Sequence, residues 1–166
     1  MPSFELFNRQ RKRRIDLRLF RSFAELAMQK VKERGAEASF PKEISVVFVS
    51  DARITQVHRE FMSIDGPTDV ITFRHGEILI SVDAAERQRE EFSGDLGREL
   101  RIYFVHGLLH LSGLDDLTEQ GFAEMARIQQ TIVREAEKEL GLARRVRVAP
   151  PRDRRRTSRQ RDSVNR

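Results

Sequence analysis

The stretch LGRELRIYFVHGLLHLSG, residues 96–113, decides how the rest of the chain must pack. Its apolar residues fall on all sides of a helix instead of along one stripe, and this pattern is typical of a helix buried inside a domain. Gly113 predicts where that helix ends, because glycine readily adopts the left-handed conformation that closes many helices. We therefore expect the fold to be built around one central, buried helix.

Shorter segments on both sides of this helix have periodicities of their own. Runs of β-branched and aromatic residues predict strands at residues 3–8, 43–50, 70–74 and 76–82. Helical periods predict further helices at residues 16–35, 51–62, 83–92 and 117–141. The last two strands flank His75 and Gly76 and are expected to form an antiparallel hairpin. The order of elements predicts an α+β fold, in which a small mixed β-sheet packs against several helices.

The composition suits one cytoplasmic domain. A chain of 166 residues is long enough for a single core, which we assign to residues 1–143. The chain contains no cysteine, which excludes disulfides and thiolate metal sites. No apolar run approaches the roughly 20 residues that a membrane-spanning helix needs, and the first residues lack the apolar stretch of a signal peptide. A cytoplasmic location without membrane contact is therefore expected.

The C-terminal segment, residues 144–166, differs sharply from the rest. It holds ten arginines and two aspartates, so it carries more positive charge than the +5 of the whole chain. It has almost no apolar side chains after Pro151, and it cannot bury enough surface to fold. We predict a disordered basic tail, which is either a non-specific polyanion binder or a solvated extension without a specific role.

Two of the four histidines, His106 and His110, lie four residues apart in the central helix. Residues at this spacing share one helix face, so both imidazoles can reach one ion. After Gly113 the chain can turn back and bring Asp115 or Asp116 to the same point. The pattern H-x-x-x-H-x-x-G-x-x-D parallels the zincin-like spacing of metzincin proteases, H-E-x-x-H-x-x-G-x-x-H. The pattern favours a metal site; the alternative is a pair of neutral histidines that are hydrogen-bonded inside a core.

Gly107 occupies the position at which zincins carry their catalytic glutamate. Without that general base, protease chemistry lacks a working group, and hydrolysis needs a base from elsewhere in the chain or from the substrate. A two-histidine, one-carboxylate iron enzyme is a third hypothesis. Nothing in the sequence indicates an oxygen-activating pocket for it.

Three motifs resemble, in order and spacing, those of the YbeY family of ribosomal RNA maturation factors. They are PTDVITF at residues 67–73, GEILIS at 76–81 and RELRIYFVHGLLHLSGLDD at 98–116. The resemblance implies an α+β fold and a metal-dependent, single-strand-specific endoribonuclease that acts in small-subunit ribosomal RNA processing and ribosome quality control. It also implies one zinc ion, the small ribosomal subunit as partner, and leaves a contact with a ribosomal protein open.

Carried over position by position, the resemblance assigns the metal to His106, His110 and Asp116. The histidines match the first two ligands of the family, Asp115 matches its motif aspartate, and Asp116 replaces its third histidine. A carboxylate is an accepted zinc ligand, but it leaves the ion at about +1 instead of +2. A water on that ion would be less acidified.

Catalytic roles are expected for His106, Arg59 and Asp69. The family places an arginine where this chain has Met62, and Arg59 lies about one helical turn earlier, where it can partly substitute. Asp69 either orients a ligand histidine or accepts a proton, or it caps the turn before the next strand.

The departures at Met62 and Asp116 leave a second function open. This is a non-catalytic ribosome-assembly factor that binds RNA, in which the metal only holds helices together. RNA binding is expected to be electrostatic, because most phenylalanines occupy core-like positions and no stacked aromatic platform is visible.

Overall fold

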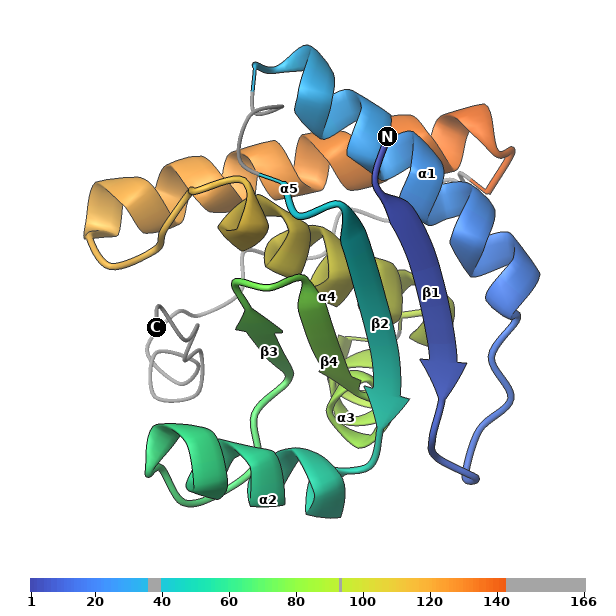
Figure 1. Ribbon diagram of the computed structural model, residues 1–166. Helices are drawn as coiled ribbons and strands as arrows, with labels where there is room; N and C mark the ends of the chain where they lie inside the picture. Colours follow the sequence, from blue (N-terminus) through green and yellow to red (C-terminus); the bar gives the residue numbers. More distant parts are fainter. Residues whose placement is uncertain (36–39, 93, 143–166) are drawn as a thin grey trace.

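The computed structural model describes residues 1–35, 40–92 and 94–142, and the expected basic tail lies outside the described residues. A four-stranded sheet has the order β1-β2-β4-β3 (Figure 1). Its strands are β1 (Ser3–Asn8), β2 (Glu43–Val49), β3 (Val70–Phe73) and β4 (Glu77–Ser81). β2 runs parallel to β1 and to β4. β3 pairs antiparallel with β4 at the edge of the sheet, which confirms the predicted hairpin.

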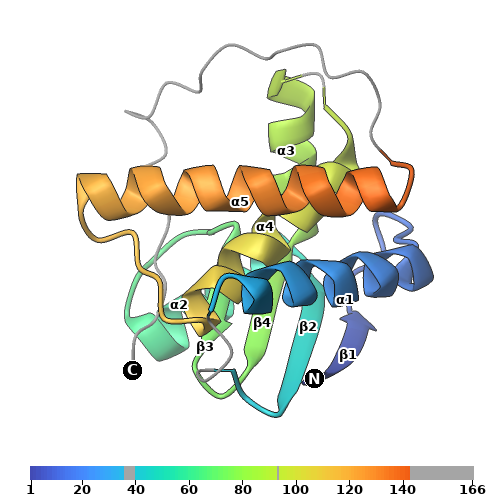
Figure 2. The same ribbon diagram turned by 90° about the horizontal axis from the view of Figure 1, so that it is seen from above.

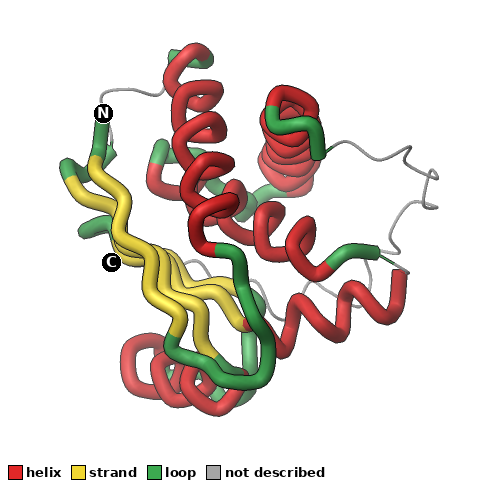
Figure 3. Tube along the Cα trace, turned by 90° about the vertical axis from the view of Figure 1, so that its right-hand side faces the viewer, coloured by secondary structure: helices red, strands yellow, loops and turns green. Residues whose placement is uncertain are grey.

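The described helices are α1 (Leu17–Glu33), α2 (Asp51–Met62), α3 (Val82–Phe92), α4 (Leu96–Leu111) and α5 (Glu119–Glu139). α1 and α5 pack against each other and against α4 (Figure 2). α2 lies on the opposite side of the sheet from α1, α4 and α5 (Figure 3). The predicted α+β fold is confirmed, and its elements lie inside the range 1–143, whose boundary as a domain stays a prediction. Within the described ranges, no helix combines the length and apolarity needed to cross a membrane.

The sheet separates two cores, because successive side chains of a strand point to opposite faces. Ile78 and Ile80 of β4 belong to the larger core, on the side of α1 and α4. Ile71 of β3 and Leu79 of β4 point the other way and form a smaller cluster with Ile54 of α2. The edge strand β3 therefore has one face toward α4 and one toward α2.

α4 is the central buried helix that the sequence predicts. It packs against α1, α3, α5, β3 and β4, and most of its side chains are buried. Gly107 marks its closest approach to the sheet: a Cβ atom there would lie 2.9 Å from both Ile78 Cγ2 and Thr72 Oγ1. The missing side chain lets α4 lie directly on β3 and β4, and this places His106 beside the edge of the sheet.

Candidate metal centre

His106, His110 and Asp116 come together at the C-terminal end of α4. The Nε2 atoms of the two histidines lie 3.0 Å apart. They lie 3.8 and 3.9 Å from the two carboxylate oxygens of Asp116. The side chains are only 8–9 % exposed. The structure thus brings together, away from bulk water, the three residues that the sequence selects.

Hydrogen bonds on the far side of each imidazole decide where its lone pair points. His110 Nδ1 lies 3.1 Å from the carbonyl oxygen of Leu114. A carbonyl oxygen can only accept, so this nitrogen carries the proton and Nε2 of the neutral ring keeps its lone pair. His106 Nδ1 lies 3.0 Å from Oε1 of Gln129, a second acceptor. With Gln129 Oε1 as acceptor, both Nε2 lone pairs face each other next to Asp116; with the Gln129 amide turned to donate, His106 Nε2–H would donate to His110 Nε2.

This arrangement suits a cation. Two lone pairs at 3.0 Å beside a carboxylate repel one another unless positive charge lies between them. Imidazole nitrogens and carboxylate oxygens bind zinc at about 2.0–2.2 Å, so tetrahedral ligand atoms lie about 3.3 Å apart. The separations of 3.0, 3.8 and 3.9 Å lie around that value. Three protein ligands are typical of catalytic zinc sites, whereas structural sites use four. The residues fit a zinc ion.

The turn after α4 selects Asp116 over Asp115. Gly113 has a φ angle of 95°, in the left-handed region, and it ends the helix as predicted. The reversal directs Asp116 back to the histidines. Asp115 remains exposed, and its Oδ1 accepts a hydrogen bond from the backbone N–H of Leu117 at 3.2 Å.

Gly107 explains why the zincin glutamate has no counterpart in this site. A side chain at this position would run into Thr72 and Ile78, both buried in the sheet. A general base cannot be placed there without moving α4 away from β3 and β4. The packing of the helix therefore disfavours the protease mechanism, in agreement with the sequence.

Arg59 and Asp69, the other residues expected to be catalytic, occupy other surroundings. Arg59 lies on α2, beyond the sheet from α4, and its Nε donates to Asp65 Oδ1 at 2.8 Å. Met62 is partly buried and packs against the smaller core. Asp69 Oδ1 accepts from the N–H of Val70 at 2.9 Å, at the start of β3, as a turn cap does. Catalytic roles for Arg59 and Asp69 stay predictions.

Gln129 is a site residue that sequence reasoning missed. It is 8 % exposed on α5, and its Oε1 atom holds His106. The available signal was its position four residues after Met125 and three before Ile132, on the buried stripe of an amphipathic helix. A polar side chain on such a stripe needs a buried partner, but the sequence does not say which one.

A separate charged cluster joins the start of α2 to the start of α3. The Ser81 hydroxyl donates to Asp51 Oδ1, and the Asp51 N–H donates to Asp83 Oδ2, each at 2.8 Å. Partial burial raises the pKa of Asp83, but this hydrogen bond together with Lys12 and Arg87 holds that pKa below its ordinary value. The pKa of Arg87 is raised by its hydrogen bond to Asp51. These charges are paired, and the cluster is a structural clamp.

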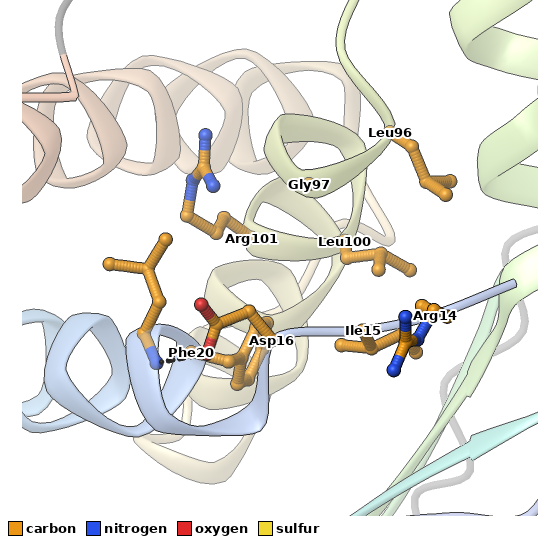
Figure 4. A pocket seen from close by; sticks show the side chains of 9 residues that line it. Arg14, Ile15, Asp16, Phe20, Leu96, Gly97, Leu100 and Arg101 are labelled. Atoms are coloured by element: carbon orange, nitrogen blue, oxygen red, sulfur yellow. Dashed lines mark hydrogen bonds between the residues drawn. The ribbon is translucent and has the colours of Figure 1, made fainter.

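A small cavity of about 90 Å³ lies between the starts of α1 and α4 (Figure 4). Arg14, Asp16 and Arg101 are the charged residues that line it. Asp16 already caps α1 by accepting from the N–H of Leu19 at 3.0 Å, and Arg101 pairs with Glu137 at 2.9 Å. The cavity lies at the end of α4 that is remote from His110, so the cluster at the other end is the stronger candidate site.

Comparisons with known proteins show what the chain is similar to. The family model described as Endoribonuclease YbeY matches residues 5–137. The chain is 35% identical over 113 residues to the Endoribonuclease YbeY of Heliobacterium modesticaldum, covering 55% of this chain and 68% of that protein. It is 37% identical over 110 residues to the protein of the same name from Bacillus licheniformis, covering 55% and 70%.

A solved structure shares the fold. The solution structure of TM1509 from Thermotoga maritima aligns with a TM-score of 0.61 at 26% identity, over 83% of this chain and 91% of that chain. The alignment spans most of both chains, so the two proteins share the overall fold.

Proposed function

Because the chain belongs to the YbeY family of endoribonucleases, we propose that it is a metal-dependent nuclease that cleaves single-stranded RNA at the cluster of His106, His110 and Asp116. The proposed metal is one zinc ion. The proposed setting is the cytoplasm, in maturation of small-subunit ribosomal RNA and in ribosome quality control. The small ribosomal subunit is the proposed partner, and a contact with a ribosomal protein stays a prediction.

The main support for the proposal is that the Nε2 atoms of His106 and His110 lie beside the carboxylate of Asp116. When bound there, a divalent ion supplies Lewis acidity, which polarises a phosphodiester and makes water a better nucleophile. The chain's own part is to fix the ligands: Leu114 and Gln129 hold the two rings in the required tautomer. In place of a third histidine, the carboxylate of Asp116 would lower the net charge of a bound ion and make it a weaker Lewis acid.

One observation favours a second candidate, a non-catalytic assembly factor. The family pattern expects an arginine at position 62. In this chain Met62 packs against the smaller core, so this position provides no cation. Arg59 is exposed, but it is paired with Asp65. In this alternative the metal holds α4 to the turn that follows it, and RNA is bound without being cut.

Cleavage of matched RNAs separates the two functions. Full-length protein supplied with zinc is incubated with an end-labelled single strand and with a duplex of the same sequence. We expect cleavage of the single strand only, loss of cleavage to background in His110→Ala, and retention in Asp115→Ala, which removes the neighbouring exposed carboxylate. Zinc-loaded wild type that binds the strand but leaves it intact would favour the assembly factor.

A further inference from the structure

Three rings from separate elements stand in a row on the α2 side of the sheet. Phe61 comes from α2, Phe73 from the end of β3, and His75 from the turn between β3 and β4. The ring centroids of Phe61 and Phe73 lie 5.6 Å apart, and their planes meet edge to face at 80°. Phe73 and His75 are stacked, with centroids 5.5 Å apart at 23°. Phe61 is an exception to the expectation that most phenylalanines occupy core positions, and the three rings form a row with one edge-to-face contact and one stacked contact.

The ends of this aromatic row face solvent. Phe61 is 60% exposed, a large value for a phenylalanine, and it is one of few exposed large apolar side chains among the described residues. The side chain of His75 is 70% exposed. Phe73 is partly buried against the smaller core, so it fixes the row to the sheet. Exposed aromatic rings on a rigid support commonly mark a binding surface.

Cationic side chains accompany the rings. Arg9 and Arg53 line a hollow of about 710 Å³ over the outer face of the sheet, together with His75 and two glutamates, Glu43 and Glu77. Rings flanked by arginines are the combination that binds single-stranded nucleic acid through base stacking and phosphate contacts.

The edge strand β3 lies between the row and α4, the helix that carries the two histidines. Thr72 Oγ1 faces α4 at Gly107, next to His106. Phe73, the following residue, points to the other face of the same edge strand. The row and α4 therefore contact opposite faces of the same edge strand.

We propose that Phe61, Phe73 and His75 form a base-stacking platform for single-stranded RNA, which holds the strand on one face of β3 while the metal centre acts on the other. The proposal rests on the proposed function for the nature of the ligand. It assigns the phosphate contacts to Arg9 and Arg53, which line the hollow beside His75.

The stacking itself can be measured. A short 2′-O-methyl oligoadenylate that carries one 2-aminopurine is titrated with full-length protein, and its intactness is checked on a gel afterwards. We expect quenching of the 2-aminopurine fluorescence with wild type. Phe61→Leu, which keeps an apolar side chain but has no ring, should bind about fivefold to 100-fold more weakly and quench less. Phe61→Tyr keeps a ring and should behave as wild type does.

The possible failures are distinguishable. Unchanged affinity and quenching in Phe61→Leu would overturn the platform and leave the row to a contact with another protein. If that result accompanies zinc-dependent cleavage by wild type, the platform fails and the proposed nuclease stands. If Phe61-dependent quenching occurs in a protein that does not cleave RNA, the platform stands and the nuclease fails.

Discussion

His106 and His110 face each other through their Nε2 atoms at 3.0 Å, while each Nδ1 is held by an oxygen acceptor. In neutral rings with these tautomers, both lone pairs point into the same small space beside Asp116. A core pair of histidines would instead use the 3.0 Å contact as a hydrogen bond from one ring to the other, and metal binding distinguishes the two. The geometry is preorganised for a cation, and this is the main physical ground for treating the cluster as a metal centre.

Gln129 should contribute to metal affinity without contacting the metal. In Gln129→Leu the acceptor for His106 Nδ1 is lost, and the ring is free to change tautomer or to rotate. We expect zinc affinity to fall about 10- to 100-fold, as is common for such supporting residues. Gln129→Glu keeps an oxygen acceptor and should bind zinc at least as well as wild type. Competition with a chromophoric chelator measures both; equal affinities in Leu and Glu variants would contradict the role.

Gly107→Ala should destabilise the fold. The new Cβ would approach Ile78 and Thr72 to 2.9 Å, and neither buried side chain can move aside freely. Overpacking of this kind costs about 1–3 kcal/mol, so the thermal midpoint should fall by several degrees. Gly97→Ala is the matched control in the same helix, because its nearest neighbour is the flexible end of Arg101. An unchanged thermal midpoint in Gly107→Ala would contradict the close packing of α4 on the sheet.

Asp83 should make stability depend on acidic pH. Its pKa in the folded protein lies below the ordinary value of 3.8, so the stabilisation is present above that pH and is lost as the pH falls below it. Asp83→Asn should therefore be less stable than wild type at neutral pH, by less than about 1 kcal/mol because Lys12 is exposed. Thermal unfolding at a series of pH values should show the two proteins converging in acid. A constant difference between them would argue against the ionised clamp.

The sequence predicts the parts of the site that are local in the chain. A helical spacing and a turn glycine suffice to bring His106, His110 and a following carboxylate together. The choice of Asp116 over Asp115 depends on the path of the turn after Gly113, which sequence spacing does not determine. Gln129 arrives from another helix, so its partner becomes known only when α5 is packed on α4.

The outer face of the sheet was even less predictable from the sequence than the metal centre. The hairpin of β3 and β4 follows from local signals, and the alternation within β3 implies that Thr72 and Phe73 face opposite ways. The parallel pairing of β2 with β1 and β4 joins segments that are distant in the chain. Phe61 and His75 come into contact with Phe73 only through that tertiary arrangement. The aromatic row therefore cannot be predicted from a local sequence pattern.

Metal analysis of three purified proteins tests the central claim most directly. Elemental analysis of wild type, Asp116→Ala and Asp115→Ala, purified without chelators, gives the zinc content of each. We predict about one equivalent in wild type and in Asp115→Ala, and loss of the metal in Asp116→Ala. Wild type without metal after supplementation with zinc, or full metal content in Asp116→Ala, would contradict the metal centre.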